Sequence, residues 1–355
     1  MTRERQRRHP APGSSRRGRA VRTRASGTVA ALVLLAGAAS ARGQATERFT
    51  LSGERVAIHN LAGQARLEPG SGASVIVTVT RGGSEGSRLR LEQRAFDGIE
   101  TLIVHYPEDE VVYSGREHGE SEIRVGEDGR LDEGRRRVRV SGRGGGLEAH
   151  ADLVISVPPG SDVELHHGVG EVTATGVQAD LLIDVSSGPV RTSETQGLLN
   201  IDTGSGSVDV TSARGDLRVD TGSGSVRVSG ASGNGILVDT GSGSVRLADI
   251  ETSNLGVDTG SGSIELGGVR ANDVLLDTGS GGVDVELLQH VDNLVIDTGS
   301  GGVTVFFPGD LGAEIEVETG SGGIDVEFPI TVQLAERTHL VGRIGDGRGR
   351  IRIDT

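Results

Sequence analysis

The stretch VDTGSGSV at residues 219–226 recurs with small changes through the second half of the chain. The copies begin at aspartates that lie 18, 19, 19, 19 and 20 residues apart, namely Asp202, Asp220, Asp239, Asp258, Asp277 and Asp297. Related stretches precede and follow them, beginning at His166, Asp184, Glu318 and Gly345. A fixed period of this length indicates a stacked architecture in which each repeat is one structural unit.

Apolar residues alternate on both sides of each Asp-Thr-Gly-Ser-Gly segment. Around Asp220, the alternating apolar residues are Leu217, Val219, Val226 and Val228. A period of two indicates a strand with one buried face, and the glycine-rich segment between the two strands is typical of a turn. One repeat cannot bury its own apolar face, whereas stacked repeats pair each strand in parallel with its copy about 4.8 Å away.

The sequence therefore predicts an all-β fold, a single-stranded parallel β-solenoid with about ten coils of 18–21 residues. The handedness of parallel crossover connections favours a right-handed coil. An antiparallel sandwich of hairpins also suits short strands and glycine turns, but it gives no reason for side chains to repeat every 19 residues. Near the C-terminus, the alternation predicts a strand through Ile324 and Val326. There we also expect bulky side chains to cap the core, namely Phe306, Phe307 and Phe328.

Asp-Thr-Gly-Ser is also the active-site signature of aspartic proteases. Such an enzyme uses two aspartates that share one proton, and each is held in a cleft by a different lobe or subunit. Six copies at one pitch predict instead a structural corner ladder, with Asp and Thr side chains bonded to backbone N–H groups two residues on and glycines at positive φ. The ladder residues are Asp202, Asp220, Asp239, Asp258, Asp277, Asp297, Thr203, Thr221, Thr240, Thr259, Thr278 and Thr298.

No group of residues in the sequence has the spacing of a catalytic site, and we expect no catalytic, cofactor-binding or metal-ligating residue. Aspartates about 4.8 Å apart repel one another, which leaves loose calcium binding along the aspartate ladder as an alternative. A polysaccharide lyase or hydrolase on the same scaffold is a further alternative. Residues 160–300, however, contain no aromatic residue to bind a sugar.

The first 45 residues differ from the remainder. They hold ten arginines between Arg3 and Arg42, together with the apolar run TVAALVLLAGAA at residues 28–39. The run has the length of a signal-peptide core, and small residues that suit cleavage end at Ala41 and Ala45. We therefore expect residues 1–45 to be a signal peptide with an arginine-rich n-region, an uncleaved anchor being the alternative. The exported chain would lie in the periplasm, at the cell surface or outside the cell, with no membrane span after cleavage.

Charge and composition exclude several classes of partner and site. The chain has 36 basic residues, all arginine, and 50 acidic residues, and removal of residues 1–45 leaves a net charge near −23. An acidic chain lacks the basic face that DNA, RNA or anionic lipid requires. The absence of cysteine excludes disulfides, thiolate metal sites and cysteine nucleophiles.

The N-terminal part, residues 46–155, is β-like but irregular. The stretch VAIHNLAGQARLEPG at residues 56–70 resembles a diverged coil. Residues 107–146, called the excursion below, are rich in charge and glycine, and we expect a solvated segment with little fixed order. Two prolines in ADLVISVPPGSDVEL, residues 151–165, suit a corner ahead of the regular repeats of residues 156–355.

Three features together resemble the DUF4097 family. They are F-x-L-x-G-x-x-V-x-I-x-N-x-x-G at residues 49–63, V-P-P-G-S at residues 157–161, and the repeated V-x-T-G-S-G-S-V rungs. Members of that family are exported or envelope β-solenoid proteins of bacteria and are labelled as candidate adhesins. The resemblance covers most of residues 46–355 and implies the same fold and a role in adhesion. It brings no catalytic residue to this chain.

We expect a non-enzymatic exported β-solenoid that acts as an adhesion or interaction module and binds an envelope protein or a glycan through its polar ladder faces. The first alternative is a carbohydrate-active enzyme. It would need a cleft with converging carboxylates beside residues 108–122 or beside the C-terminal loop at residues 329–345. The second alternative is a structural envelope component that self-associates end to end, because the ends of a solenoid expose edge strands.

Overall fold

The computed structural model of the protein describes residues 46–116, 119–131 and 134–355, so the predicted signal peptide lies outside the described residues. In the described part of the unit from Gln44 to Thr355, twenty-six strands belong to one sheet and four to another. The same part also has one short 3-10 helix, η1 (Gly86–Arg88). Within the described ranges, no helix is long and apolar enough to cross a membrane. The predicted all-β, largely parallel architecture is confirmed.

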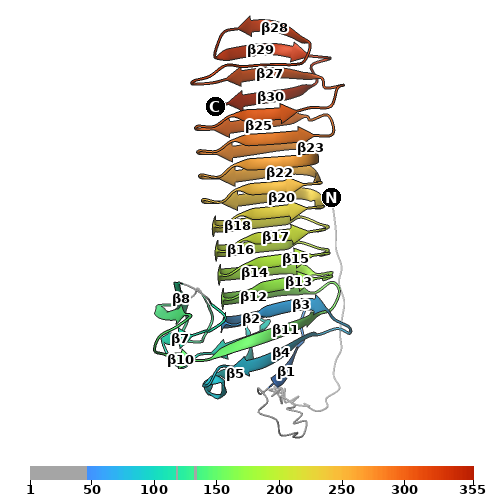
Figure 1. Cartoon of the computed structure of the whole chain (residues 1–355). Helices are drawn as coiled ribbons and strands as arrows, with labels where there is room; N and C mark the ends of the chain where they lie inside the picture. Colours follow the sequence, from blue (N-terminus) through green and yellow to red (C-terminus); the bar gives the residue numbers. More distant parts are fainter. Residues whose placement is uncertain (1–45, 117–118, 132–133) are drawn as a thin grey trace, which may run out of the picture. The chain divides into compact units, whose positions relative to one another are not determined.

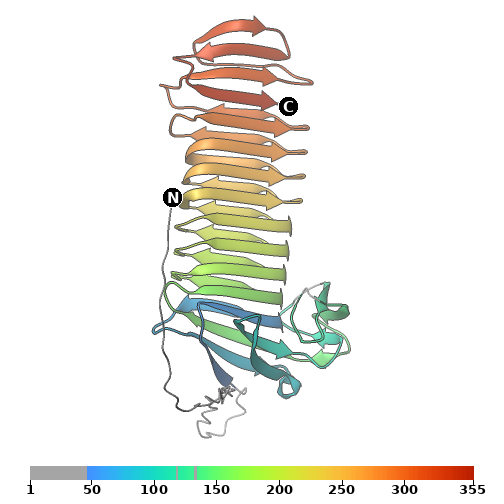
Figure 2. The same ribbon diagram turned by 180° about the vertical axis from the view of Figure 1, so that it is seen from behind.

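The large sheet consists of two rows of stacked strands, here called sheet B and sheet A, and successive repeats add one strand to each (Figure 1, Figure 2). Sheet B contains β2 (Arg55–Ala62), β5 (Arg90–Phe96), β6 (Ile99–His105), β12 (Asp162–Val169), β14 (Asp180–Ser187), β16 (Leu199–Ser205), β18 (Leu217–Ser223), β20 (Ser232–Thr240), β22 (Glu251–Thr259), β23 (Ile264–Thr278), β25 (Asn293–Thr298), β27 (Ala313–Glu318), β28 (Ile330–Ala335), β29 (His339–Ile344) and β30 (Gly349–Asp354). Sheet A contains β1 (Thr46–Leu51), β3 (Ala65–Pro69), β4 (Val75–Gly82), β11 (His150–Val157), β13 (Val172–Thr175), β15 (Val190–Ser193), β17 (Val208–Thr211), β19 (Val226–Ser229), β21 (Val245–Ala248), β24 (Val283–Leu287) and β26 (Val303–Phe306). Strand β23 takes part in both rows and joins them.

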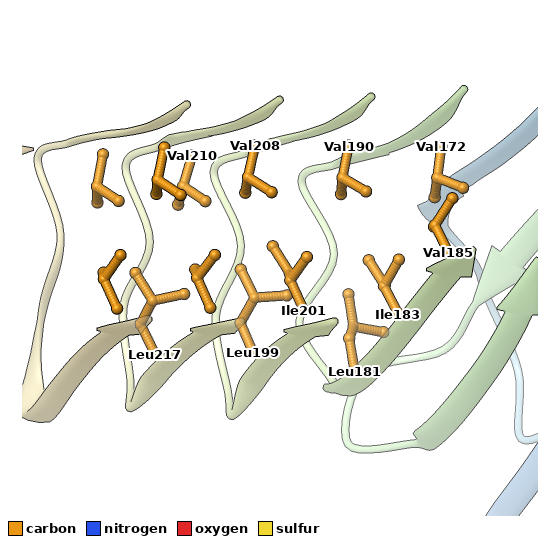
Figure 3. Close-up of a cluster of buried hydrophobic side chains, with 14 of the residues drawn as sticks. Val172, Leu181, Ile183, Val185, Val190, Leu199, Ile201, Val208, Val210 and Leu217 are labelled. Carbon is orange, nitrogen blue, oxygen red and sulfur yellow. The ribbon is translucent and has the colours of Figure 1, made fainter. Parts of the chain in front are cut away.

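The core lies between the two rows. Leu181 of sheet B faces Val190 of sheet A, and Leu199 and Val208 repeat the arrangement one coil further on (Figure 3). All four side chains are buried. Each such side chain stabilises the fold by roughly 1.5–3 kcal/mol when fully buried, and the conformational entropy of the chain offsets most of this. The alternation seen in the sequence is therefore the alternation between the core and the outer faces.

The stretch at residues 56–70 forms the first coil, as its sequence predicts. Strand β2 pairs in parallel with β12, and β3 pairs in parallel with β13. The chain then leaves the coil, and antiparallel pairing of β1 with β4 and of β5 with β6 closes this end of the two rows. It returns along β11, which lies between β3 and β4.

The excursion is folded, in contrast to the prediction of a solvated segment with little order. Three of its strands and the two residues that follow it form a four-stranded sheet of β7 (Glu110–Val112), β8 (Glu120–Val125), β9 (Arg136–Ser141) and β10 (Leu147–Glu148). The buried apolar residues of this segment are Val111, Tyr113, Ile123, Val125, Leu131, Val138, Val140 and Leu147. Alternation of these residues with arginines and glutamates supplies one buried face, which the high overall charge of the segment hides in the sequence.

The last coils are stacked in an order that differs from the order of the sequence. Strand β30, at the C-terminus, inserts between β25 and β27 and pairs in parallel with both (Figure 1). Strand β29 then pairs antiparallel with β27, and β28 pairs antiparallel with β29. The copy at Gly345 therefore contributes one strand to sheet B, and this strand does not lie at the end of the stack.

Two expectations for this end of the chain are corrected. Ile324 and Val326 lie outside any strand and are only half-buried. Strand β30 separates β27 from β25, so the segment that follows β27 does not continue the stack beside β26. Phe307 and Phe328 pack edge to face with ring centroids 6.0 Å apart, as a cap requires. Phe306, in contrast, points outward and is 64% exposed.

Candidate functional site

The outer face of sheet B carries an unbroken row of carboxylates. In the register of the paired strands, each lies beside the next in the order Asp184, Asp202, Asp220, Asp239, Asp258, Asp277, Asp297, Asp354 and Glu318. Carboxylates on strands about 4.8 Å apart repel one another. Burial and the charges of Asp239 and Asp277 raise the pKa of Asp258 above its ordinary value. The ladder is therefore an electrostatically coupled surface.

The threonines beside these aspartates point the other way, into the core. No more than 1% of the surface of any of these threonines is exposed, namely Thr203, Thr221, Thr240, Thr259, Thr278 and Thr298. The Thr259 hydroxyl donates to the carbonyl oxygen of Gly243 in the preceding coil at 2.9 Å, and three other threonines of the series make the equivalent bond. Thr240 also accepts from the N–H of Gly243, three residues on, at 3.1 Å. Four of these hydroxyls thus join one coil to the next, and that of Thr240 also makes a bond within its own turn, to the third residue on and not the second that the sequence suggested.

The second glycine of each segment is required by the close approach of successive coils. A Cβ atom at Gly243 would lie 1.8 Å from the carbonyl oxygen of Gly224, and one at Gly262 would lie 1.9 Å from that of Gly243. The equivalent Gly206 has a φ of 159°, but the φ values of Gly243 and Gly262 are not in the positive range. Steric exclusion explains the recurrence of glycine better than the positive φ expected from the sequence.

A histidine pair occupies the N-terminal end of the ladder. His166 lies beside Asp184 in the register, and its Nδ1 is 3.0 Å from a carboxylate oxygen of that residue. Burial lowers the pKa of His166, but the hydrogen bonds and charges of Asp184 and Glu164 outweigh burial and raise it. His59, one strand further on, stacks on His166 with ring centroids 4.5 Å apart. The ladder therefore ends in an imidazole that is bonded to a carboxylate and covered by a second imidazole.

The excursion covers this histidine pair. The backbone N–H of Leu131 donates to Nδ1 of His59 at 3.2 Å, which assigns the proton of the neutral ring to Nε2. Burial, followed by the charges of His166 and Arg130, lowers the pKa of His59 from 6.5 to about 3. A second contact with the coils runs from Arg116 to the hydroxyl of Ser187 at 3.1 Å. The excursion therefore contacts the coils at this end of the ladder, and His59 is neutral at physiological pH.

The C-terminal end of the ladder also carries a histidine. His339 of β29 lies opposite Glu318 of β27, and its Nε2 is 3.4 Å from Glu318 and 3.6 Å from Glu316. The three ligand atoms of these residues lie within 4.8 Å of one another. Within the described ranges, this is the group of histidine and carboxylate side chains with the spacing to hold a metal ion.

A short apolar strip runs beside the ladder. Leu237 and Leu275, each two residues before a ladder aspartate, are 48% and 55% exposed on the outer face of sheet B. Gly256 lies between them in the register, and a Cβ atom there would lie 2.8 Å from a methyl group of Leu237. A partner on this face would thus meet negative charge next to apolar side chains.

Acidic residues also line a surface depression on the excursion, but arginines neutralise them. Glu108, Asp109 and Glu110 contribute to its lining. Their carboxylates pair with Arg88 at 2.6 Å, Arg136 at 2.5 Å and Arg139 at 3.8 Å, respectively. A glycosidase needs one carboxyl as acid and another as base or nucleophile. In this depression each of the three carboxylates is instead paired with an arginine.

Comparison with known proteins identifies the family of the chain. A family model described as Toastrack DUF4097 matches residues 137–355. The chain belongs to the DUF4097 family. This Toastrack protein is also similar to the crystal structure of a candidate cell adhesion protein from Clostridium sporogenes ATCC 15579, with 10% identity, coverage of 88% of this chain and 94% of that chain, and a TM-score of 0.24. No curated protein matches the Toastrack chain.

Three parts of the site in this Toastrack protein escape the sequence interpretation. The stack of His59 on His166 joins residues 107 positions apart, which only the pairing of β2 with β12 reveals. Asp354 occupies a ladder position, and the signal for it was present, since the final IRIDT repeats the apolar–Asp–Thr pattern. His339 approaches Glu318 through an antiparallel hairpin, for which the repeat gives no signal.

Proposed function

We propose that this Toastrack protein is an exported, non-enzymatic β-solenoid that acts as an adhesion or interaction module at the cell surface or in the periplasm. A right-handed stack of about ten coils would present its binding face. The ligand class that we propose is an envelope protein or a glycan, bound along the outer face of sheet B.

The observation that carries this proposal is the continuous ladder from Asp184 to Glu318, with the apolar strip beside it. A regular face of this kind suits an extended partner, because hydroxyl, amide or cationic groups of the partner can meet one carboxylate per coil. The apolar side chains of Leu237 and Leu275 would add contact area beside the charged row. Repeat proteins commonly bind along such extended surfaces.

Binding can be tested on an array of immobilised envelope glycans and on envelope extracts. Asp239→Asn, Asp258→Asn and Asp277→Asn together remove three adjacent charges from the ladder. The matched control removes three charges from the outer face of sheet A, with Asp209→Asn, Glu265→Gln and Asp284→Asn. We expect the ladder variant to lose binding and the control to keep it. Equal binding by both variants would place the interaction elsewhere.

Location can be tested by protease treatment of intact cells. An epitope inserted between Gly144 and Gly145 would be tolerated, because a Cβ atom at either glycine meets no atom within 4 Å. Loss of the epitope while a periplasmic control protein survives supports a position at the surface. An epitope that survives until the outer envelope is opened excludes a surface adhesin and leaves a periplasmic interaction module.

End-to-end self-association is a second candidate function, favoured by one edge of the fold. Among the described strands, β26 pairs with β24 on one side alone, so its other edge is open. The exposed Phe306 lies on this strand. An open edge is a template for a strand of another copy. Sedimentation velocity at rising protein concentration should detect association that Phe306→Glu removes, and a monomer at every concentration would contradict it.

A carbohydrate-active enzyme on the same scaffold remains the alternative to a binding module. Two carboxylates, Glu316 and Glu318, do converge beside the C-terminal loop, but both are exposed on an outer face. Glycoside hydrolysis needs a site that holds the sugar between its two carboxyls, and an open strand face does not enclose one. Release of reducing sugar from envelope polysaccharides by the purified protein would overturn the non-enzymatic proposal.

A further inference from the structure

We propose that Glu316, Glu318 and His339 form a binding site for one divalent transition-metal ion of the zinc class. The site lies near the C-terminal end of the outer face of sheet B, on strands β27 and β29. One ligand atom from each residue lies within 4.8 Å of the other two. The site shares Glu318 with the carboxylate ladder, but metal binding by it does not require the proposed interaction function.

The distances around His339 are those of metal ligands and not of hydrogen bonds. Its Nε2 is 3.4 Å from a carboxylate oxygen of Glu318 and 3.6 Å from one of Glu316. A normal N–H···O bond has a donor–acceptor distance of about 2.7–3.2 Å. Two ligand atoms bound at about 2.0–2.2 Å to one tetrahedral ion lie roughly 3.4 Å apart. An ion between the three atoms would therefore need only small side-chain movements.

The nitrogen itself lacks another partner. Nε2 of His339 is buried at the level of the atom and makes no hydrogen bond, although the side chain is partly exposed. A buried polar atom without a partner is costly and calls for a ligand or a water molecule. Two carboxylates on one side of it favour a cation as that ligand.

The fold places the three side chains on rigid strands. Glu316 and Glu318 are two residues apart on β27, so both point to the outer face. The antiparallel register sets His339 directly opposite Glu318. Because β30 inserts on the other side of β27, Asp354 also lies beside Glu318 and adds negative charge near the site. Sites on strands hold their ligands with less variation than sites on loops.

The donor set indicates the class of metal. Imidazole together with carboxylate suits zinc, nickel, cobalt or iron, whereas calcium and magnesium prefer oxygen ligands alone. The neighbouring aspartate ladder offers only oxygen, so the two parts of the same face should differ in the metals that they bind. Three protein ligands leave one coordination position for water or for a group of a partner.

The test is titration of the purified, tag-free protein with zinc chloride and calcium chloride in a calorimeter. We expect one equivalent of zinc to bind and calcium to bind far more weakly. Cobalt chloride should produce the visible absorption bands of a tetrahedral site containing nitrogen and oxygen ligands. Absence of zinc binding by the wild-type protein would overturn the proposal.

Variants locate the bound ion. His339→Asn and Glu316→Gln should each weaken zinc binding by more than the roughly tenfold to hundredfold that loss of an outer-shell partner costs. The matched control is Glu314→Gln, on the same strand and face, whose carboxylate pairs with Arg343 at 3.4 Å. Circular dichroism shows whether each variant is folded. If His339→Asn does not fold, Glu316→Gln still tests the site, because Glu316 is exposed and its substitution should not disturb the fold. Zinc binding that survives both substitutions, or that Glu314→Gln removes equally, overturns the site.

Discussion

His59 and His166 lie face to face, with ring centroids 4.5 Å apart and ring planes 4° from parallel. Their pKa values move in opposite directions, because burial dominates at His59 whereas Asp184 and Glu164 dominate at His166. Through its bond to Leu131, the pair also connects the excursion to the first coils. Protonation of His59 would place two cationic rings in contact and break that bond.

The first prediction concerns stability at acidic pH. Burial lowers the pKa of His59 from 6.5 to about 3 and that of His167 from 6.5 to about 4. Between these values the unfolded chain binds more protons than the folded chain, so the free energy of unfolding falls as the pH falls. We expect a loss of about 2 kcal/mol per histidine between pH 7 and pH 5. His166 opposes this trend, because its raised pKa adds stability at low pH.

Substitution can assign this pH dependence. His59→Asn keeps an acceptor for the N–H of Leu131 but does not titrate, so the difference in unfolding free energy between pH 7 and pH 5 should shrink by about 2 kcal/mol. Urea unfolding followed by circular dichroism is suitable, because the chain contains no tryptophan. An unaltered pH dependence in His59→Asn would contradict the assignment.

The second prediction concerns the close approach at the corners. Gly243→Ala should destabilise the protein by about 1–3 kcal/mol or more, because its Cβ atom would meet the carbonyl oxygen of Gly224. Gly235→Ala is the matched control, since a Cβ atom there meets no atom within 4 Å. Thermal unfolding should separate the two variants clearly. Similar melting temperatures would show that the coils can move apart at little cost.

The third prediction concerns repulsion along the ladder. Asp258→Asn should stabilise the protein by the order of 1 kcal/mol at low salt, because Asp239 and Asp277 flank that residue. The gain should diminish as salt screens the exposed charges. Asp209→Asn should instead destabilise the protein, because Asp209 lies 3.9 Å from Arg191 and 3.6 Å from Arg227. Melting temperatures at low and high sodium chloride concentration test the expected gain in one variant and the expected loss in the other. Stabilisation by both variants would argue against a specific effect of the ladder.

The fourth prediction concerns the inserted C-terminal strand. Ile351→Ala should cost about 2–5 kcal/mol, because this side chain is fully buried between β25 and β27. Ile330→Ala, at a half-buried position on β28, should cost less. Hydrogen exchange should then show faster exchange in β27 and β29 in the first variant. Retention of full protection there would mean that the hairpin does not depend on the insertion of β30.

The repeat made most of the fold predictable from sequence. Apolar residues such as Leu217 and Val219 recur with a period of two within each strand and with a period near 19 between coils. Only parallel stacking in register accounts for both periods. The aspartate ladder follows from the same register. The excursion was misjudged because its strands carry arginine and glutamate on the outer face, so that composition hides the alternation.

The sequence by itself determined which residues repeat, and hence which faces are apolar, acidic or glycine-bearing. Tertiary structure alone decided which coils are neighbours where the repeat is broken. Strand β30 fits beside both β25 and β27, because parallel pairing depends on matching side-chain pattern and not on the order of the chain. The contact of His59 with His166 depends on the parallel pairing of β2 with β12. The contact of His339 with Glu318 depends on the antiparallel pairing of β29 with β27, and each pairing joins segments that no local pattern relates.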